Sequence, residues 1–516
     1  MKFERVAGIL LHPTSLPGNY GIGTIGKEAF NFIDFLVHSG QKLWQIFPLG
    51  PTGYGDSPYQ SFSAFAGNPL LISFELLIED GILSSVDLDT FPKFDKHQIN
   101  FGELIKVKNT LLYKAYRNFK NSDVVFSTEY KNFVNSNKEW LEDFALFMAV
   151  KEYHNGKLWT EWENDIAFRL AGAVEKWQTK LKDEVDYYKF LQFTFHKQWA
   201  NLKKYANEKG IKIIGDIPIF IAYDSADLWA NKHLFSVDEK GKLLSVAGVP
   251  PDYFSPTGQL WGNPLYKWNE MEKDNFAWWQ KRIKKVLEFV DIIRIDHFRG
   301  FDAYWEIPGD AKTAEHGKWI KAPGHKLFSI IKKEMGDLPI LAEDLGIITE
   351  SVEKLRDDFN FPGMKILQFA FGENGDKKFL PHNHIKNCVV YTGSHDNDTT
   401  KGFFEKEKQN NSGIFEWAQK YLDYYEDDLT FKLIKTAYAS VANFVIIPLQ
   451  DILNLGSEAR MNFPGKLGGN WTWRFSWEQL DNNLPQIYRE LTIIYERPPL
   501  KKEIIDNNTP KEFLPE

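Results

Sequence analysis

The stretch Asp291-Ile-Ile-Arg-Ile-Asp-His-Phe-Arg-Gly300 is a short apolar run, rich in β-branched residues, that ends in polar side chains. Such a run is typical of a strand in a parallel sheet whose two faces are both covered. In a strand, Arg294 and Asp296 lie two residues apart and point to the same side. The arginine would either hold the carboxylate ionised and oriented, as a nucleophile requires, or form a structural ion pair with it. The local pattern leaves both interpretations open.

The same pattern recurs along the chain and predicts eight strands. Between most of these runs lie segments with apolar residues at helical spacing, such as 27–38, 276–289 and 349–359. This alternation predicts an α/β fold, and eight units favour a closed (β/α)8 TIM barrel over an open doubly wound sheet. The predicted strands are residues 6–12, 42–49, 211–220, 291–298, 338–344, 364–371, 388–395 and 443–451.

The alternation breaks between the second and third predicted strands. The intervening residues show helical spacing, so we expect an inserted, mostly helical subdomain at 68–208. A second insertion, 224–269, is rich in Gly, Pro and Trp and is expected as a long ordered loop, which in compact domains is usually functional. Residues 1–516 are thus predicted to form a single barrel domain with inserted subdomains.

Composition excludes several classes of protein. The formal net charge is −8 and no basic stretch occurs, which argues against nucleic acid or an anionic membrane as partner. The single cysteine, Cys388, lies in an apolar run, where we expect a buried thiol in a reducing compartment. We see no signal peptide and no run of about 18 apolar residues, so a cytoplasmic location is expected. The sequence gives no indication of an oligomeric state.

A barrel demands that functional residues lie at the carboxyl ends of its strands. Five acidic residues meet this demand, although acidic side chains are poor strand formers and costly to bury unpaired. Packing alone does not explain five such residues at the same end of successive strands. They are Asp216, Asp296, Glu343, Asp396 and Asp451.

Two of these strand ends suggest particular chemistry. Glu343 ends the apolar run 338–344, where burial should raise its pKa and suit it to general-acid work, whereas Asp344 is expected to cap the next helix. His395 and Asp396 end another strand, and a histidine next to an aspartate could also be half of a metal site. Because no complementary ligand spacing lies nearby, we expect neither a metal nor an organic cofactor.

Several sequence blocks carry a resemblance to a known family. Arg294-Ile-Asp296, Glu343-Asp344 and His395-Asp396-Asn397 resemble blocks of the α-amylase clan, and the wider set is similar to its amylomaltase, or disproportionating enzyme, family. The resemblance extends from about Gly8 to Trp477, with the blocks in the expected order. The wider set comprises Gly8-Ile-Leu-Leu-His-Pro-Thr-Ser-Leu-Pro17, Tyr54-Gly-Asp-Ser-Pro-Tyr59, Gly215-Asp-Ile-Pro-Ile219, Val249-Pro-Pro-Asp-Tyr-Phe-Ser255, Gln259-Leu-Trp-Gly-Asn-Pro264 and Arg460-Met-Asn-Phe-Pro-Gly465.

The resemblance implies a role for each matching residue. Asp296 would be the nucleophile, Glu343 the general acid/base, and Asp396 a stabiliser of the transition state through sugar hydroxyls. Arg294 would orient Asp296, and His395 would hydrogen-bond the sugar. Segments 246–268 and 458–473 would wall the glucan groove. The remaining implied substrate-binding residues are Tyr54, Asp56, Asp216, Asp252, Trp261 and Asn462.

The activity that the resemblance implies is that of a retaining 4-α-glucanotransferase acting on maltooligosaccharides and α-1,4-glucans. An α-1,4-glucan hydrolase of the same clan is the alternative, because motifs near the nucleophile do not determine whether sugar or water releases the intermediate. A glucan-binding protein without activity needs no nucleophile and acid together. The fingerprint-like Gly21-Ile-Gly-Thr-Ile-Gly26 does not follow a strand directly, so we do not expect a nucleotide site there.

Overall fold

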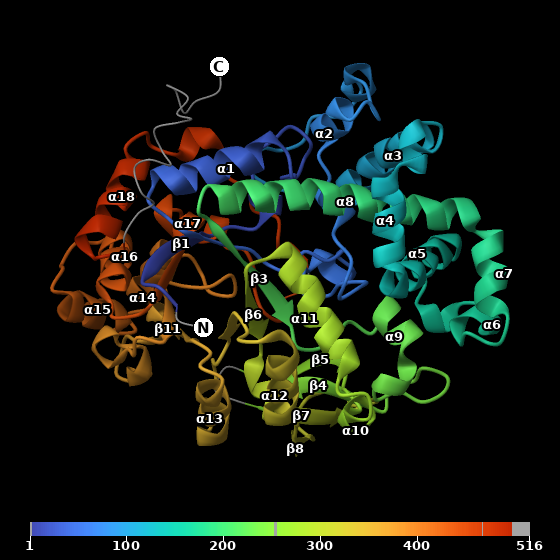
Figure 1. Ribbon diagram of the computed structural model, residues 1–516. Helices are drawn as coiled ribbons and strands as arrows, with labels where there is room; N and C mark the ends of the chain where they lie inside the picture. Colours follow the sequence, from blue (N-terminus) through green and yellow to red (C-terminus); the bar gives the residue numbers. More distant parts are fainter. Residues whose placement is uncertain (1–2, 252–254, 467, 498–516) are drawn as a thin grey trace.

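A closed barrel of parallel strands forms the centre of the molecule (Figure 1). The computed structural model describes residues 3–251, 255–466 and 468–497. The strand order around the barrel is β1-β12-β11-β10-β9-β6-β3-β2. Each predicted run contributes one strand, so the predicted (β/α)8 barrel is confirmed. The strands are β1 (Val6–Leu10), β2 (Leu43–Gln45), β3 (Lys212–Pro218), β6 (Ile292–Asp296), β9 (Ile340–Ala342), β10 (Gly363–Ile366), β11 (Cys388–Tyr391) and β12 (Phe444–Pro448).

Helices surround the barrel because each covers one apolar stripe against the strands. Figure 1 shows α1 and α8 side by side along the top of the view, with α11 and α12 lower down. The helix α1 begins after Gly26. In the loop before it, position 23 must be glycine, because a Cβ there would lie 1.9 Å from the carbonyl oxygen of Pro13. The surrounding helices are α1 (Lys27–His38), α8 (Lys182–Glu208), α11 (Ala277–Phe289), α12 (Gly324–Met335), α13 (Glu350–Asp358), α14 (Thr400–Gln409), α15 (Ile414–Leu422), α16 (Thr430–Ala439), α17 (Leu449–Ile452) and α18 (Leu484–Ile494).

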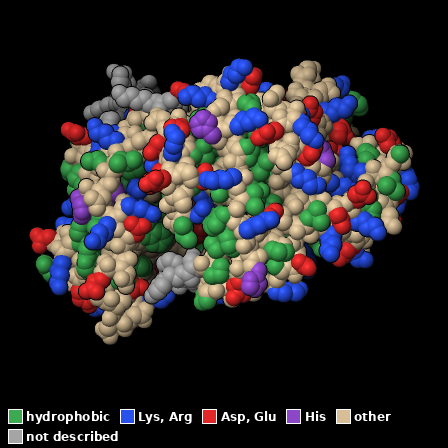
Figure 2. Space-filling model, turned by 90° about the horizontal axis from the view of Figure 1, so that it is seen from below, with side chains coloured by type: hydrophobic (Ala, Val, Ile, Leu, Met, Phe, Trp, Pro, Cys, Tyr) green, Lys and Arg blue, Asp and Glu red, His purple; other side chains and the backbone are tan. Residues whose placement is uncertain are grey.

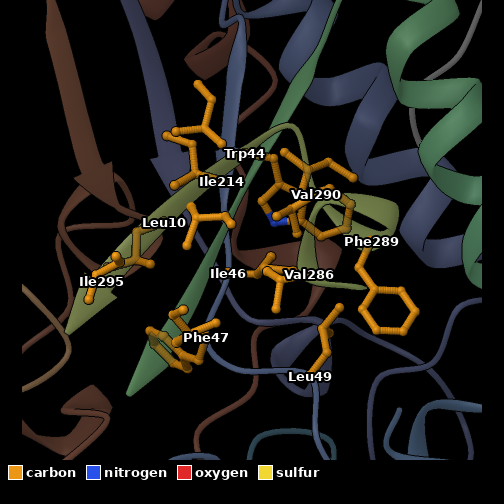
Figure 3. Packing of buried hydrophobic residues seen from close by; sticks show 14 of the residues in the cluster. Leu10, Trp44, Ile46, Phe47, Leu49, Ile214, Val286, Phe289, Val290 and Ile295 are labelled. Atoms are coloured by element: carbon orange, nitrogen blue, oxygen red, sulfur yellow. The ribbon is translucent and has the colours of Figure 1, made fainter. Parts of the chain in front are cut away.

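The barrel is filled and covered by large apolar side chains. Figure 3 draws Trp44 of β2 and Ile214 of β3 in the same buried cluster as Phe289, which ends α11, and Val290, which follows it. Trp44 is fully buried and donates its indole N–H to the carbonyl oxygen of Leu11 at 2.7 Å. The core therefore keeps the strand ends, and the side chains they carry, in fixed positions.

The first and last strands close the barrel. β1 pairs with β12 in parallel register, from Val6 with Phe444 to Leu10 with Pro448. Arg497 lies under this junction, fully buried, and donates from Nη1 to the carbonyl oxygen of Val6 at 3.1 Å and that of Asn443 at 3.3 Å. The guanidinium thus joins the chain beyond α18 to both strands of the closure.

The segment between β2 and β3 is helical, as its spacing predicts, and lies to one side of the barrel in Figure 1. Its last helix, α8, contacts the inserted helices and also α1, α11 and β3 of the barrel. The proposed subdomain limits, 68–208, therefore include a helix that also belongs to the outer layer of the barrel. The inserted helices are α2 (Phe74–Glu79), α3 (Phe101–Lys120), α4 (Thr128–Ser136), α5 (Lys138–Tyr153), α6 (Asn164–Ala167) and α7 (Ala173–Lys180).

The second insertion, 224–269, is not the long loop that its composition predicts. It contains α9 (Ala226–Ala230), two strands and the start of α10 (Trp268–Glu272). These strands pair with two more that follow β6, giving an antiparallel sheet in the order β5-β4-β7-β8. The partners come from another part of the chain, so the local sequence of the insertion does not reveal the pairing. The four strands are β4 (Ser245–Val249), β5 (Gln259–Pro264), β7 (Ala303–Pro308) and β8 (Lys318–Lys321).

Charges of both signs are interspersed over the face seen in Figure 2. That face therefore has no broad region of positive charge, and such a region is what attracts polyanions. Within the residues that the structure describes, no helix is both long enough and apolar enough to cross a membrane.

Candidate active site

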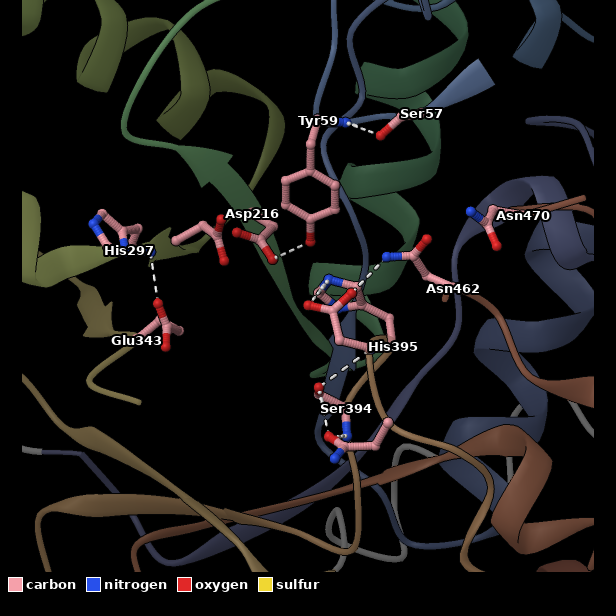
Figure 4. Close-up of polar contacts among 12 residues, drawn as sticks. Ser57, Tyr59, Asp216, His297, Glu343, Ser394, His395, Asn462 and Asn470 are labelled. Carbon is pink, nitrogen blue, oxygen red and sulfur yellow. Dashed lines mark hydrogen bonds and ion pairs between the residues drawn. The ribbon is translucent and has the colours of Figure 1, made fainter. Parts of the chain in front are cut away.

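The carboxyl ends of four barrel strands bring acidic side chains together. Asp216 lies in β3, Asp296 ends β6, Glu343 follows β9, and Asp396 follows β11. In Figure 4, Glu343 lies on one side and His395 and Asn462 on the other, with Asp216 between them. The parallel barrel therefore assembles these predicted site residues at one end, as the sequence analysis expects.

Arg294 links two of these carboxylates. Its Nη1 lies 2.5 Å from Oδ2 of Asp216, and its Nη2 lies 3.0 Å from Oδ1 of Asp296. Burial opposes the charge of Arg294, but the two carboxylates outweigh it and hold the pKa of the guanidinium well above its ordinary value. The Asp296 side chain is 31% exposed, whereas that of Arg294 is 4% exposed. Asp296 is thus held from the barrel side and open on the other.

Asp216, a predicted substrate-binding residue, is enclosed by its neighbours. Its side chain has no exposed surface. Besides Arg294, it accepts a hydrogen bond from the hydroxyl of Tyr59 at 2.9 Å, drawn in Figure 4. Burial, with the nearby charge of Asp296, raises the pKa of Asp216 against the opposing effect of Arg294. A carboxylate enclosed in this way anchors Arg294, and substrate contact by Asp216 stays a prediction.

Glu343 is held by two backbone donors. Its Oε2 accepts from the N–H of His297 at 2.7 Å, and its Oε1 accepts from the N–H of Leu345 at 2.9 Å. Burial raises the pKa of Glu343, and the charge of Asp296 raises it further, against Arg294 and the two donors. The expectation of a raised pKa at this strand end therefore agrees with its surroundings.

Asp344 does not cap the next helix as predicted. Its Oδ2 lies 2.5 Å from Nη1 of Arg356 within α13, and its Oδ1 accepts from the N–H of Met364 at 2.7 Å. A short loop separates it from the first turn of α13, and the carboxylate instead reaches a side chain in the last turn of the helix. Asp344 thus ties α13 to β10.

Asp396 is oriented by side chains from two segments. Its Oδ1 accepts from Nδ2 of Asn462 at 2.6 Å, and its Oδ2 lies 3.4 Å from Nε2 of His395. Arg460 donates to the backbone carbonyl of Asp396 at 2.6 Å. The ring of His395 is buried and stacks on Tyr59, with ring centroids 5.1 Å apart. The segment 458–473 therefore reaches directly to this carboxylate, which is itself half exposed.

Comparison with known proteins identifies the family of this chain. A family model described as 4-alpha-glucanotransferase matches residues 11–480. The chain belongs to this family. It is 49% identical over 505 residues to a 4-alpha-glucanotransferase of Synechocystis, covering 96% of this chain and 99% of the relative. A Clostridium butyricum protein of the same name is 49% identical over 493 residues, covering 94% of this chain and all of the relative.

A solved structure agrees with this membership. Amylomaltase from Streptococcus agalactiae, in complex with acarbose, is 42% identical to this chain and superposes with a TM-score of 0.92. The match covers 96% of this chain and all of that protein. The resemblance inferred from the sequence blocks is confirmed, and the enzyme is a glycosyltransferase of the 4-alpha-glucanotransferase type.

The other predicted substrate-binding residues of the glucanotransferase lie farther out. Tyr54 is 74% exposed, and Asp56 adopts a left-handed backbone with φ 55°. Asp56 lines a cleft of about 450 Å³ that also includes Asn470. Trp261 of β5 stands perpendicular to the ring of His297, with centroids 4.8 Å apart. Asp252 lies outside the described residues.

The sequence analysis singled out Asp451 as a candidate functional residue and did not single out Tyr59. Asp451 is buried and accepts from the hydroxyls of Thr392 and Thr400 and from the N–H of Thr400, so its contacts are structural. Tyr59 joins Asp216 to His395, although within its sequence block only Tyr54 and Asp56 were singled out. The sequence feature that could have pointed to Tyr59 is its place in the block Tyr54–Tyr59, because no periodicity marks a residue in a loop.

Proposed function

We propose that this enzyme moves α-1,4-glucan segments from a donor maltodextrin to the 4-hydroxyl of an acceptor glucan or glucose by a retaining double displacement. The observation that carries the proposal is the difference between two neighbouring carboxyl groups. Arg294 forms an ion pair with the Asp296 carboxylate at 3.0 Å, while burial and the charge of Asp296 raise the pKa of Glu343. Glycoside cleavage with retention needs such a pair, one group ionised and the other protonated.

The two inversions follow from these states. Asp296 attacks the anomeric carbon while Glu343 gives its proton to the leaving glycosidic oxygen, which forms a covalent glucosyl ester on Asp296. Glu343, now a carboxylate, takes the proton of the acceptor 4-hydroxyl as that oxygen attacks the same carbon. The second inversion restores the α configuration and releases Asp296.

We assign the sugar contacts to residues around this pair. Asp396, oriented by Asn462, would hydrogen-bond sugar hydroxyls and stabilise the transition state, with His395 beside it. Trp261 would stack against a sugar ring from the small sheet. Asp56 would bind glucan in the cleft that it lines, with the exposed Tyr54 close by in the sequence, and Asp252 is proposed from its sequence block alone.

Transfer requires that sugar, not water, reach the glucosyl ester. Two segments outside the barrel place side chains against the site: β5 contributes Trp261, and the 458–473 segment contributes Arg460 and Asn462. Such walls restrict water and hold an acceptor, which favours transfer over hydrolysis. This support distinguishes the proposal from an α-1,4-glucan hydrolase with the same carboxylates.

Incubation with maltotriose alone tests the proposal. We expect a ladder of longer maltodextrins together with glucose, resolved by chromatography over time, each product with retained α linkages by proton NMR. If glucose and maltose form without longer products, the enzyme is a hydrolase and not a transferase. Products of inverted configuration would refute the double displacement.

The pH dependence of transfer should reflect the raised pKa of Glu343. The donor cleavage step needs Glu343 protonated, so kcat/KM stays high up to its pKa and falls as the pH rises through it. Because the pKa lies above the ordinary value of about 4.3, the alkaline limb should lie well above pH 5. A kcat/KM profile for maltotriose between pH 4 and 10 measures this limb. A decline that begins near pH 4.5 would contradict the assignment of Glu343 as the acid.

Replacing Asn462 by alanine should weaken transfer by removing the hydrogen bond that orients Asp396. The carboxylate is half exposed, so the loss should be about 1 kcal/mol, or roughly five-fold in kcat/KM. Asn31→Ala, on the outer helix α1, is the matched control and should leave kcat/KM unchanged. Equal kcat/KM in the two variants would show that Asn462 does not orient Asp396.

A further inference from the structure

His297 follows the proposed nucleophile and has an uncommon backbone conformation. Its φ is 54° and its ψ is 49°, in the left-handed region. Residues other than glycine rarely adopt this region, although Asn, Asp and His enter it more readily than a β-branched residue does. The turn ends β6 and points the N–H of His297 at Oε2 of Glu343, 2.7 Å away, as Figure 4 shows.

This N–H completes the environment of the carboxyl group. The N–H of Leu345 holds the other oxygen at 2.9 Å. Both donors favour the ionised form of Glu343 and so oppose burial, which raises its pKa. Asp296 and Arg294 of β6 are the charged groups that act on the same carboxyl. A change at His297 that leaves both in place therefore alters one contribution only.

The His297 ring packs against neighbouring residues. The ring stands edge-on to Trp261, at an interplanar angle of 89°. On another side the backbone comes close, since a Cβ added at Gly300 would lie 3.2 Å from Cδ2 of His297. Burial lowers the pKa of His297 to about 3, and Arg299 adds to the shift, so the ring is neutral at working pH. Its effect on Glu343 is therefore through the backbone and not through charge.

We propose that His297 is a positioning residue for the reaction: its left-handed backbone turns the chain directly after the Asp296–His297 peptide, and this turn keeps in place the N–H that orients the Glu343 carboxyl. The inference rests on the proposed role of Glu343 as acid/base. The proposed role of His297 depends on its backbone conformation. Substitutions that differ in how readily they adopt the left-handed conformation can therefore separate this role from any role of the side chain.

The test compares His297→Asn and His297→Gly with His297→Val. Asparagine and glycine accept the left-handed conformation and keep the N–H in place, so the alkaline limb of kcat/KM should stay within about a few tenths of a pH unit of the wild type. Valine resists it, withdraws the N–H and should move the limb up by about one unit, with a fall in kcat of roughly ten-fold. His297→Ala should give an intermediate shift and replaces the valine variant if that variant does not fold.

Each outcome decides the inference. A shift that follows the order Asn or Gly, Ala, Val supports it. An unshifted limb in the valine or alanine variant overturns it, as does an equal shift in all variants, since that would trace the effect to loss of the ring. Glu343→Gln is assayed in parallel: if it remains active, the proposed role of Glu343 has failed, whereas an inactive Glu343→Gln with unshifted His297 variants refutes the inference alone.

Discussion

Replacing Asp296 by asparagine should lower kcat/KM for transfer between maltodextrins by at least about 10⁴-fold. The amide has nearly the shape of the carboxylate but no charge and little nucleophilicity, so the glucosyl ester does not form. Its carbonyl oxygen can still accept from Nη2 of Arg294, which now lies 3.0 Å from Oδ1 of Asp296. The fold should therefore survive, and disproportionation of maltotriose should disappear.

The matched control is Asp291, which lies just before β6, at the opposite end of the barrel from Asp296. Asp291 precedes β6 and accepts from the N–H of Ile213 at 2.8 Å and from Nδ2 of Asn207 at 3.0 Å. Asp291→Asn should keep kcat close to wild type, because that end of a TIM barrel serves stability and not catalysis. Activity of Asp296→Asn within ten-fold of the wild type would rule out Asp296 as the nucleophile.

Replacing Arg294 by methionine should damage stability as well as activity. The change leaves Asp216, whose side chain has no exposed surface, without its cationic partner. Breaking a buried ion pair by removing one member costs about 3–5 kcal/mol. Asp296 also loses the contact that orients it, so kcat/KM should fall by roughly 10³-fold. Urea unfolding and maltotriose kinetics on the same preparation measure both effects.

A double variant separates the two effects of Arg294. In Arg294→Met with Asp216→Asn, the buried carboxylate is gone, so most of the lost stability should return. Activity should stay low, because Asp296 still lacks its partner. Recovery of activity along with stability would mean that the guanidinium acts only as a structural support and does not orient the nucleophile.

The barrel and the acidic residues at one end of it could be predicted because both depend on patterns within single segments of the sequence. Continuous β-branched runs such as 388–395 mark buried strands, and an acidic residue at the end of such a run is conspicuous. The eight strands and the grouping of Asp296, Glu343 and Asp396 followed from these marks. What each acid touches was not encoded nearby. Asp451 is satisfied by Thr392 and Thr400, and Asp216 is enclosed by Arg294 and Tyr59, all from other segments.

The antiparallel sheet outside the barrel was missed for a related reason. β4 pairs with β7, which lies beyond the whole of β6, and the insertion has Gly and Pro where strand patterns are sought. Gly248 is needed there because a Cβ would lie 2.2 Å from the carbonyl oxygen of Gln259. A residue that reads locally as a loop signal thus marks a close approach between strands.

The junction of β1 and β12 bears on how the chain is made. Val6 pairs with Phe444, so roughly 440 residues must be synthesised before the first strand meets its last neighbour. At about 5–20 residues per second, that interval is roughly 20–90 s. During it one edge of β1 is unpaired, and such an edge is open to pairing with other chains. Arg497, which bonds to Val6 of β1 and to Asn443 just before β12, emerges later still and can secure the junction only after β1 and β12 have both been made.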